Sequence, residues 1–371
     1  MFIFIIKNVT KNRFLQLNYL KILSNKKFDG IISIRVKGGV NMVKILFYDT
    51  KEYDKELFNN YNKNYNFEIK YLETKLNHET APLAQGYDAV CIFVNDIADK
   101  ETLEILKECG VKLLVLRCAG FNNVDIAHLP EGLKVVRVPR YSPNAVAEHA
   151  VALLLSVDRK IYKSYQRTKK YNFTLNGLLG FDIHGKTVGV IGTGAIGKVF
   201  IQIMKGFGTE VIAYDVYEDK KAEAELGFKY VSLDEIYERS DIISLHCPLT
   251  KDNENMIDNV AMKKMKKSVV IINTSRGKLI NSKDLIKALS TEKIGGVGLD
   301  VFDDEGDFFL NDMSNSYYRS PELSVLLSMP NVVITSHQAF FTKEALDKIG
   351  EVSMDNIKSF FDNGECENFV E

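Results

Sequence analysis

The chain has little net charge, no long apolar run and no internal repeat. Its formal net charge is −1, so its overall charge gives no indication of binding to nucleic acids or membrane surfaces. No apolar run approaches the roughly 18 residues that a membrane-spanning helix needs. With 46% apolar and 26% charged residues, the chain has the composition of a soluble globular protein with sizeable cores.

Cysteine is scarce and scattered. The five cysteines are Cys91, Cys109, Cys118, Cys247 and Cys366, and no two of them form a CxxC pair. No cluster of His, Cys and Asp has the spacing of a metal site, so no metal is predicted. Most of the cysteines lie among apolar residues, which indicates reduced, buried thiols in a cytoplasmic protein.

The first 41 residues differ from the rest of the chain. They hold eight Lys or Arg residues against one acidic residue, Asp29, and they begin with the short apolar run MFIFII. A strand-like start, MVKILFYDT, follows at Met42. We therefore expect 1–41 to be an extra leader outside the fold. It is either upstream sequence translated from an early start or a genuine basic tail, and the intact mass of the native protein distinguishes the two.

Short apolar runs alternate with helical segments after Met42, which predicts an α/β protein with parallel sheets. Two such series are separated by a long apolar helix at 145–159, and 371 residues suit two domains. The predicted fold is two Rossmann-like, doubly wound parallel-sheet domains with a cleft between them. The first would comprise 42–141 with 341–371, because the terminal helix can pack back on it, and the second 142–340. The strand candidates are 44–48, 67–71, 89–93, 113–116 and 134–138, followed by 187–191, 211–214, 230–231, 242–245, 269–273, 297–301 and 332–335.

The most informative stretch is TVGVIGTGAIGKVFIQIMKGFGTEVIAYD, residues 187–215. In a dinucleotide-binding turn, Gly192 permits the tight bend, Gly194 lets backbone amides approach a pyrophosphate, and Gly197 lets the helix pack on the strand. The pyrophosphate would then lie at a helix N-terminus. Asp215, 18 positions after Gly197, would accept hydrogen bonds from the adenosine ribose. Because its charge would repel a 2′-phosphate, we predict NAD and not NADP.

Three polar residues lie just beyond the ends of predicted strands, where open α/β sheets bind ligands. They are Arg276, Glu305 and His337. Histidine can donate a proton to the alkoxide that forms when a ketone is reduced, and a neighbouring Glu305 would favour the charged imidazolium and orient the ring. The planar fork of Arg276 can bond the carboxylate and carbonyl oxygens of a 2-oxo acid. The pattern predicts hydride transfer between a nicotinamide and such an acid.

Structural roles are the alternative for each of these side chains. Arg276 could be a surface or ion-pair arginine, and the acidic run around Glu305 has the composition of a solvated loop. His246 ends a predicted strand, so it could line the cofactor pocket without transferring protons. The remaining histidines have no convergent partners and are expected to be structural; they are His78, His128, His149 and His184.

Long stretches of the chain resemble the D-isomer-specific 2-hydroxyacid dehydrogenase family, and within it the fermentative bacterial D-lactate dehydrogenases. The resemblance covers Met42 to Glu371. It implies that Arg276 binds and polarises the substrate, that Glu305 pairs with the catalytic histidine, and that His337 is the proton donor in reduction. The matching stretches are LRCAGFNNVDIAHL (116–129), VPRYSPNAVAEHAVALLLSVDRKI (138–161), YQRTKKYNFTLNGLLGFDIHGKTVGVIGTGAIGKV (165–199), DIISLHCPLT (241–250), INTSRGKLI (272–280), GLDVFDDE (298–305) and HQAFFT (337–342).

The resemblance also implies further site residues and an association. Substrate-binding candidates are the backbone of Ala119 and Gly120 and the side chains of Phe93, Tyr141 and Phe340. Such aromatic walls favour a methyl group, hence pyruvate. The family dimerises through its cofactor domains, so a homodimer or homotetramer is expected. Besides the three glycines and Asp215, the cofactor-binding candidates are Ala195, Ile196, Cys247, Pro248, Asn253, Thr274, Ser275 and Asp300.

Three functions remain in competition. The leading hypothesis is NADH-dependent reduction of pyruvate to D-lactate. The second keeps this chemistry with a bulkier branched-chain or aromatic 2-oxo acid. The third is a binding module that senses NAD(H) without turnover, although all three predicted catalytic positions are filled and no interaction domain is appended.

Overall fold

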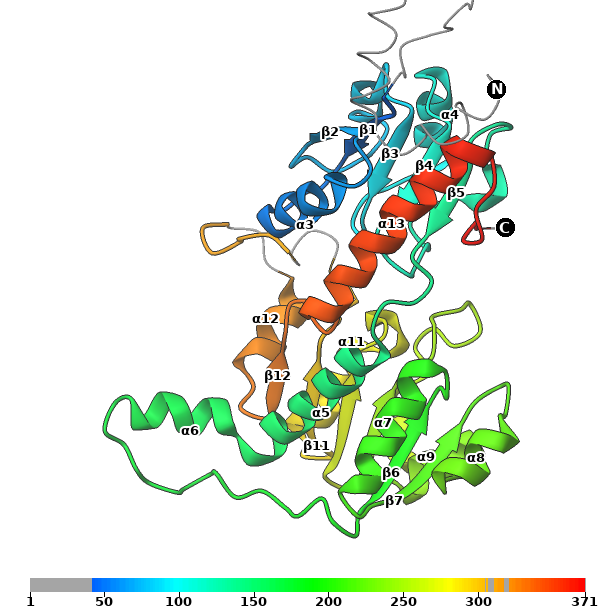
Figure 1. Ribbon diagram of the computed structural model, residues 1–371. Helices are drawn as coiled ribbons and strands as arrows, with labels where there is room; N and C mark the ends of the chain where they lie inside the picture. Colours follow the sequence, from blue (N-terminus) through cyan, green and yellow to red (C-terminus); the bar gives the residue numbers. More distant parts are fainter. Residues whose placement is uncertain (1–41, 304, 306–309, 317–319, 371) are drawn as a thin grey trace, which may run out of the picture. The chain divides into compact units, whose positions relative to one another are not determined.

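The computed structural model describes residues 42–303, 305, 310–316 and 320–370. The expected leader, 1–41, lies outside these residues. Within them the chain forms two sheets whose strands are all parallel and are flanked by helices (Figure 1). The predicted pair of doubly wound parallel-sheet folds is confirmed.

The first sheet has five strands in the order β2-β1-β3-β4-β5. Since β3 returns to pair with the other side of β1, the strand order reverses between β1 and β3. The strands are β1 (Lys44–Phe47), β2 (Glu68–Tyr71), β3 (Ala89–Ile92), β4 (Leu113–Leu116) and β5 (Lys134–Arg137), and the helices packed with them are α3 (Glu52–Asn62), α4 (Lys100–Glu108) and α13 (Lys343–Asn363).

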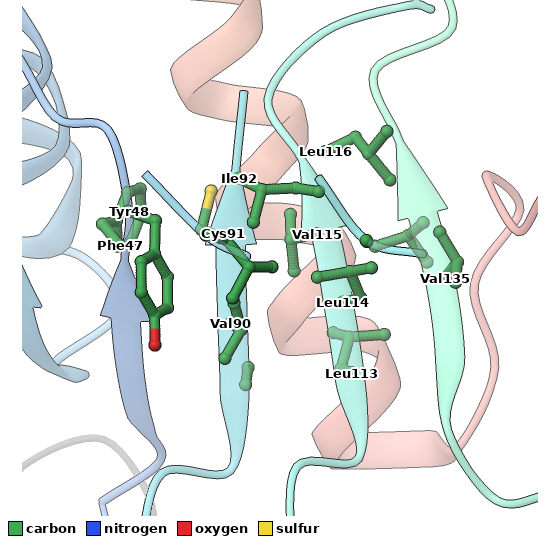
Figure 2. Packing of buried hydrophobic residues seen from close by; sticks show 14 of the residues in the cluster. Phe47, Tyr48, Val90, Cys91, Ile92, Leu113, Leu114, Val115, Leu116 and Val135 are labelled. Carbon is green, nitrogen blue, oxygen red and sulfur yellow. The ribbon is translucent and has the colours of Figure 1, made fainter. Parts of the chain in front are cut away.

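The centre of this sheet is apolar on both faces. All four residues of β3 and all four of β4 are buried, as expected for parallel strands covered by helices on each side. Figure 2 shows their side chains in layers with those of β1 and β5, and helix α13 passes behind β4. The C-terminal helix therefore belongs to the core of the sheet formed by the N-terminal strands.

The second sheet has seven strands in the order β12-β11-β10-β9-β6-β7-β8. Its strand order reverses between β6 and β9, where open α/β sheets place their ligand crevice. The strands are β6 (Thr187–Ile191), β7 (Glu210–Tyr214), β8 (Lys229–Tyr230), β9 (Ile242–Leu245), β10 (Val269–Asn273), β11 (Ile294–Leu299) and β12 (Val332–Ile334). The helices are α5 (Pro143–Arg159), α6 (Ile161–Thr168), α7 (Ala195–Gly206), α8 (Lys220–Leu226), α9 (Leu233–Arg239), α10 (Asn259–Lys264), α11 (Ser282–Ser290) and α12 (Pro321–Ser328).

Most predicted strands differ from the observed ones by one residue or none, but β11 begins three residues before the predicted 297. Gly295 and Gly296 hide its start, because glycine carries no strand preference. Their lack of a side chain suits the packing, since a Cβ on Gly296 would lie 2.5 Å from the side chain of Val157 in α5. The close approach of α5 to β11 therefore explains why glycines occupy positions where apolar strand residues were expected.

The structure also bears on the expectations for membranes, thiols and metals. Among the described helices, none is both long and apolar enough to cross a bilayer. All five cysteines are free thiols; Cys247 and Cys366 are partly exposed and the other three are buried. In the part of the chain that the structure covers, no three His, Cys, Asp or Glu side chains are grouped so that they could hold a metal ion.

Candidate functional site

A cavity of about 410 Å³ lies at the carboxyl ends of strands from both sheets. Residues that follow β3 and β4 line one side of it, and residues that follow β9, β10 and β11 line the other. The cavity thus brings together side chains that are far apart in the sequence. The predicted site residues on its wall are Phe93, Ala119, Gly120, Tyr141, Ile196, Pro248, Thr274, Ser275, Arg276, Asp300, His337 and Phe340.

The glycine turn joins β6 to α7 with the geometry that a dinucleotide requires. Gly192 has φ +96°, and a Cβ there would lie 2.5 Å from the backbone nitrogen of Cys247. A Cβ on Gly197 would lie 2.0 Å from the carbonyl oxygen of Gly192, so only glycine lets the helix start this close to the strand. Gly194 caps α7 without a side-chain hydrogen bond and has open space beside it. The helix N-terminus is therefore accessible to a pyrophosphate.

Asp215, at the end of β7, anchors this turn. Its Oδ2 accepts hydrogen bonds from the backbone nitrogen of Thr193 at 2.6 Å and from the Thr193 hydroxyl at 3.0 Å, and its Oδ1 accepts one from the Tyr217 backbone at 3.0 Å. The carboxylate is thus held at the edge of the turn, where it can also receive the hydroxyls of a ribose. The residues present fit NAD.

Arg276 lies in the turn after β10, three positions beyond its last residue. Its backbone carbonyl accepts a hydrogen bond from Asn273 Nδ2 at 2.9 Å, and its Nη1 donates to the Ser275 carbonyl at 2.7 Å. On the opposite wall, a Cβ on Gly120 would lie 2.4 Å from Arg276 Nη2. The guanidinium therefore touches the backbone of the loop that follows β4, and both face the same cavity.

His337 lines the cavity and is in contact with Glu305. The Nδ1 of His337 lies 3.2 Å from Glu305 Oε1, and each side chain is 20% exposed. The other carboxylate oxygen, Oε2, accepts a hydrogen bond from the Phe302 backbone at 3.4 Å. Because Nδ1 faces the carboxylate, Nε2 is the nitrogen left to face a ligand. Glu305 itself therefore has a defined partner, unlike a carboxylate of a solvated loop.

Asp300 shapes the turn that presents His337. This carboxylate is fully buried at the end of β11. Its Oδ1 accepts hydrogen bonds from the Thr335 hydroxyl at 2.5 Å and the Gln338 backbone at 2.9 Å, and its Oδ2 accepts one from the Ala339 backbone at 2.8 Å. Between these donors the backbone of His337 adopts a left-handed conformation with φ +52°. The position of the His337 imidazole therefore depends on the buried carboxylate of Asp300.

A histidine expected to be structural takes part in this network. His149, from α5, has its Nε2 3.0 Å from the Thr335 hydroxyl and 3.3 Å from Asp300 Oδ1. The expectation that His149 has no convergent partner was therefore wrong. No local sequence pattern indicates this contact, because 151 positions separate His149 from Asp300. Burial would raise the pKa of Asp300, but hydrogen bonds from His149, Thr335 and the two amides outweigh it and hold the pKa below its usual value.

Aromatic side chains form the wall of the cavity on the side of the first sheet. The rings of Phe93 and Phe340 lie 5.7 Å apart, and those of Tyr141 and Phe340 lie 6.4 Å apart. The guanidinium of Arg117, a buried residue that also lines the cavity, lies 5.0 Å from the centre of the Phe93 ring. Burial raises the pKa of Tyr141 to about 12, so its hydroxyl stays neutral.

Two predicted cofactor residues, Asn253 and Cys247, do not line the cavity, and hydrogen bonds hold them and Ser275 in their loops. Asn253 closes the loop after β9 by donating to the Pro248 carbonyl at 2.8 Å and accepting from the Thr250 backbone at 2.7 Å. The Ser275 hydroxyl donates to the Cys247 carbonyl at 2.6 Å. These contacts tie the loop after β9 to the turn that carries Arg276.

His246 is held neutral at the edge of the cavity. Its Nε2 lies 2.9 Å from the Ser244 hydroxyl, and its ring packs on Phe200. Its Nδ1 is shielded from solvent and has no hydrogen-bond partner among the described residues. Burial lowers the pKa of His246 to about 3. An imidazole that stays neutral at physiological pH is suited to lining the pocket and not to donating a proton.

The stability of the protein should therefore fall between pH 7 and pH 5 through His246. Because its pKa is lowered by folding, the unfolded chain binds a proton first, and stability that is present above about pH 6.5 is lost as the pH falls. The loss over this interval is up to about 2 kcal/mol. Urea unfolding at both pH values measures it, and His246→Gln should lose correspondingly less. An equal loss in the variant would contradict this assignment.

Comparison with known proteins identifies the family. The family described as "D-isomer specific 2-hydroxyacid dehydrogenase, NAD binding domain" matches residues 151–339. The D-lactate dehydrogenase of Escherichia coli is 46% identical over 327 residues, which cover 88% of this chain and 99% of that protein. Its apo structure has a TM-score of 0.80 at 44% identity and covers 89% of this chain and 100% of its own.

Two other solved structures are similar over nearly their full lengths. The pyruvate reductase of Chlamydomonas reinhardtii has a TM-score of 0.81 at 42% identity, covering 86% of this chain and 96% of its own. The NAD complex of a D-isomer specific 2-hydroxyacid dehydrogenase from Lactobacillus delbrueckii ssp. bulgaricus has a TM-score of 0.75 at 32% identity, covering 89% and 100%. The chain is thus an oxidoreductase that belongs to the D-isomer-specific 2-hydroxyacid dehydrogenase family and carries its NAD-binding domain.

Proposed function

We propose that this chain reduces pyruvate to D-lactate with NADH, reversibly. The observation that supports it best is His337, paired with Glu305, on the wall of the same cavity as Arg276. The names of the E. coli and C. reinhardtii relatives, D-lactate dehydrogenase and pyruvate reductase, support the same substrate. The aromatic side chains of Phe93, Tyr141 and Phe340 line this cavity, and such walls are expected to favour a methyl substituent.

The chain's own residues would contribute positioning and a proton. Arg276 holds the carboxylate and polarises the carbonyl of the 2-oxo acid. Among the described residues only its Nη1 has a protein acceptor, which leaves its other N–H groups for the substrate. When bound, NADH supplies the hydride to the carbonyl carbon. His337 Nε2 gives its proton to the carbonyl oxygen, which becomes the hydroxyl of lactate, and Glu305 stabilises the charged ring beforehand. Asp300 keeps the turn, and so the imidazole, in place.

A panel of 2-oxo acids tests this assignment. The expected result is a higher kcat/KM with NADH for pyruvate than for 2-oxoisocaproate or phenylpyruvate, and D-lactate as the product on chiral analysis. A preference for a larger acid would favour the alternative of a bulkier substrate. A folded protein that binds NADH but reduces none of the acids would favour the NAD(H)-sensing module.

His337→Asn should lower kcat for pyruvate by about 10²- to 10⁴-fold while leaving the Kd of NADH unchanged, because the proton donor is lost and asparagine tolerates a left-handed backbone. Stopped-flow reduction and NADH titration measure the two quantities. His128→Asn is the matched control, since His128 is exposed and contacts Asp125 outside the cavity. Loss of NADH affinity in the His337 variant, in parallel with turnover, would show that the histidine is structural.

We further propose that the protein is a homodimer or homotetramer. The segment that follows α6 exposes large apolar side chains, with Tyr171, Phe173, Leu175 and Leu179 between 69% and 90% accessible. Such a cluster is typical of a surface covered by another chain. Sedimentation velocity should give a dimer or tetramer for the wild type and a smaller species for the double variant Leu175→Asp, Leu179→Asp. A monomeric wild type would rule the proposal out.

A further inference from the structure

Arg137 is the last residue of β5, and its backbone is fixed from the C-terminal side of the chain. Its N–H donates to the Asn368 carbonyl at 3.1 Å, and its carbonyl accepts from Asn356 Nδ2 at 3.0 Å. Asn356 lies in α13 and is buried. The base of the arginine is therefore rigid, and the parallel strand directs it toward the cavity at the carboxyl edge of the sheet.

The guanidinium of Arg137 contacts the loop that follows β4. Its Nη1 donates to the Ala119 carbonyl at 2.9 Å, and its Cζ lies 5.0 Å from the centre of the Phe121 ring. In the described part of the chain, no carboxylate lies within 4 Å of it, whereas the guanidinium of Arg117 is paired with Asp54. Arg137 thus brings an uncompensated positive charge to the cavity wall.

Fixing the Ala119 carbonyl also fixes the next amide. In a planar trans peptide the C=O of one residue and the N–H of the next point in opposite directions. The Gly120 N–H therefore points away from Arg137, and this N–H has no acceptor among the residues that the structure describes. A cation bound to the carbonyl also polarises the peptide and makes its N–H a stronger donor. Arg276 touches the same Gly120.

We propose that Arg137 is a positioning residue for the substrate carboxylate, acting through the Ala119–Gly120 peptide. It orients and strengthens the Gly120 N–H as a donor to the carboxylate that Arg276 also binds. The loop would then lie between two guanidinium groups, one from each sheet. This inference rests on the proposed function, because it presumes that the ligand is a 2-oxo acid. It adds a specific role to a residue that does not touch the reacting carbon.

Steady-state kinetics of Arg137→Met tests the inference. Methionine keeps an unbranched apolar stem beside Phe121 but removes the donor and the charge. Losing one charge-assisted hydrogen bond should raise the KM for pyruvate roughly tenfold or more. The kcat and the KM for NADH should stay within about twofold, because the contacts of Arg137 are confined to the carboxylate loop. Inhibition by oxamate, which has the same carboxylate, should weaken in parallel.

Two further variants complete the experiment. Arg140→Met is the control, since Arg140 is exposed, lies three positions away and does not line the cavity. Arg137→Lys keeps the charge but not the planar fork, so its KM for pyruvate should rise roughly threefold, and it decides the question if the methionine variant does not fold.

The outcomes separate this inference from the proposed function. A KM for pyruvate that stays within twofold in Arg137→Met would overturn the inference, as would a parallel loss of kcat, NADH affinity and melting temperature. If the wild type prefers another 2-oxo acid, the proposed substrate fails, but the same comparison is made with that acid because it carries the same carboxylate. If the wild type reduces no 2-oxo acid, both proposals fail.

Discussion

The buried carboxylate of Asp300 is the constraint on which the site depends. It ends a strand in the core, yet its oxygens receive hydrogen bonds from the Thr335 hydroxyl and from the amides of Gln338 and Ala339. A charge buried so deeply is tolerable only because these donors surround it. They belong to the turn that carries His337, so the same contacts that satisfy the charge fix the left-handed backbone and the direction of the imidazole.

Topology then determines which residues can meet. In both sheets every strand is parallel, so the residues that follow the strands gather at one edge. In the second sheet the order reverses between β6 and β9, and the glycine turn and His246 follow those two strands. Arg276 and Asp300 follow the next strands along, β10 and β11. A site assembled from strand ends in this way needs little local sequence signal beyond the strands themselves.

The sequence predicted those features whose physical cause is local. The glycine turn, the acidic residue after β7 and the alternation of strands and helices are read within about 30 residues, and the two parallel sheets followed from them. The start of β11 was missed because glycines replace the usual apolar residues there. The contact of His149 with Asp300 was missed for another reason, since it joins a helix before the glycine turn to a strand far beyond it. Arg137 gave no signal either, because its partner is a backbone carbonyl.

The predicted site residues lie close together, and some of them also have structural roles. The structure places Arg276 and His337 on the wall of one cavity, with Glu305 in contact with His337. Asn253 and Ser275, proposed from resemblance as cofactor contacts, have visible structural duties as loop ties. These hydrogen bonds are compatible with cofactor binding, because a loop that binds a ligand must first be held in one conformation.

The final residues of the chain have a consequence for the sheet beside the site. Phe369 forms an antiparallel bridge with Val136 in β5, the outermost strand of the first sheet. An uncovered outer strand offers unpaired backbone groups to other chains and invites aggregation. Residues near Phe369 cover this edge of the sheet, so removing them would expose unpaired backbone groups of β5. It would also remove the Asn368 carbonyl, which accepts a hydrogen bond from the Arg137 backbone.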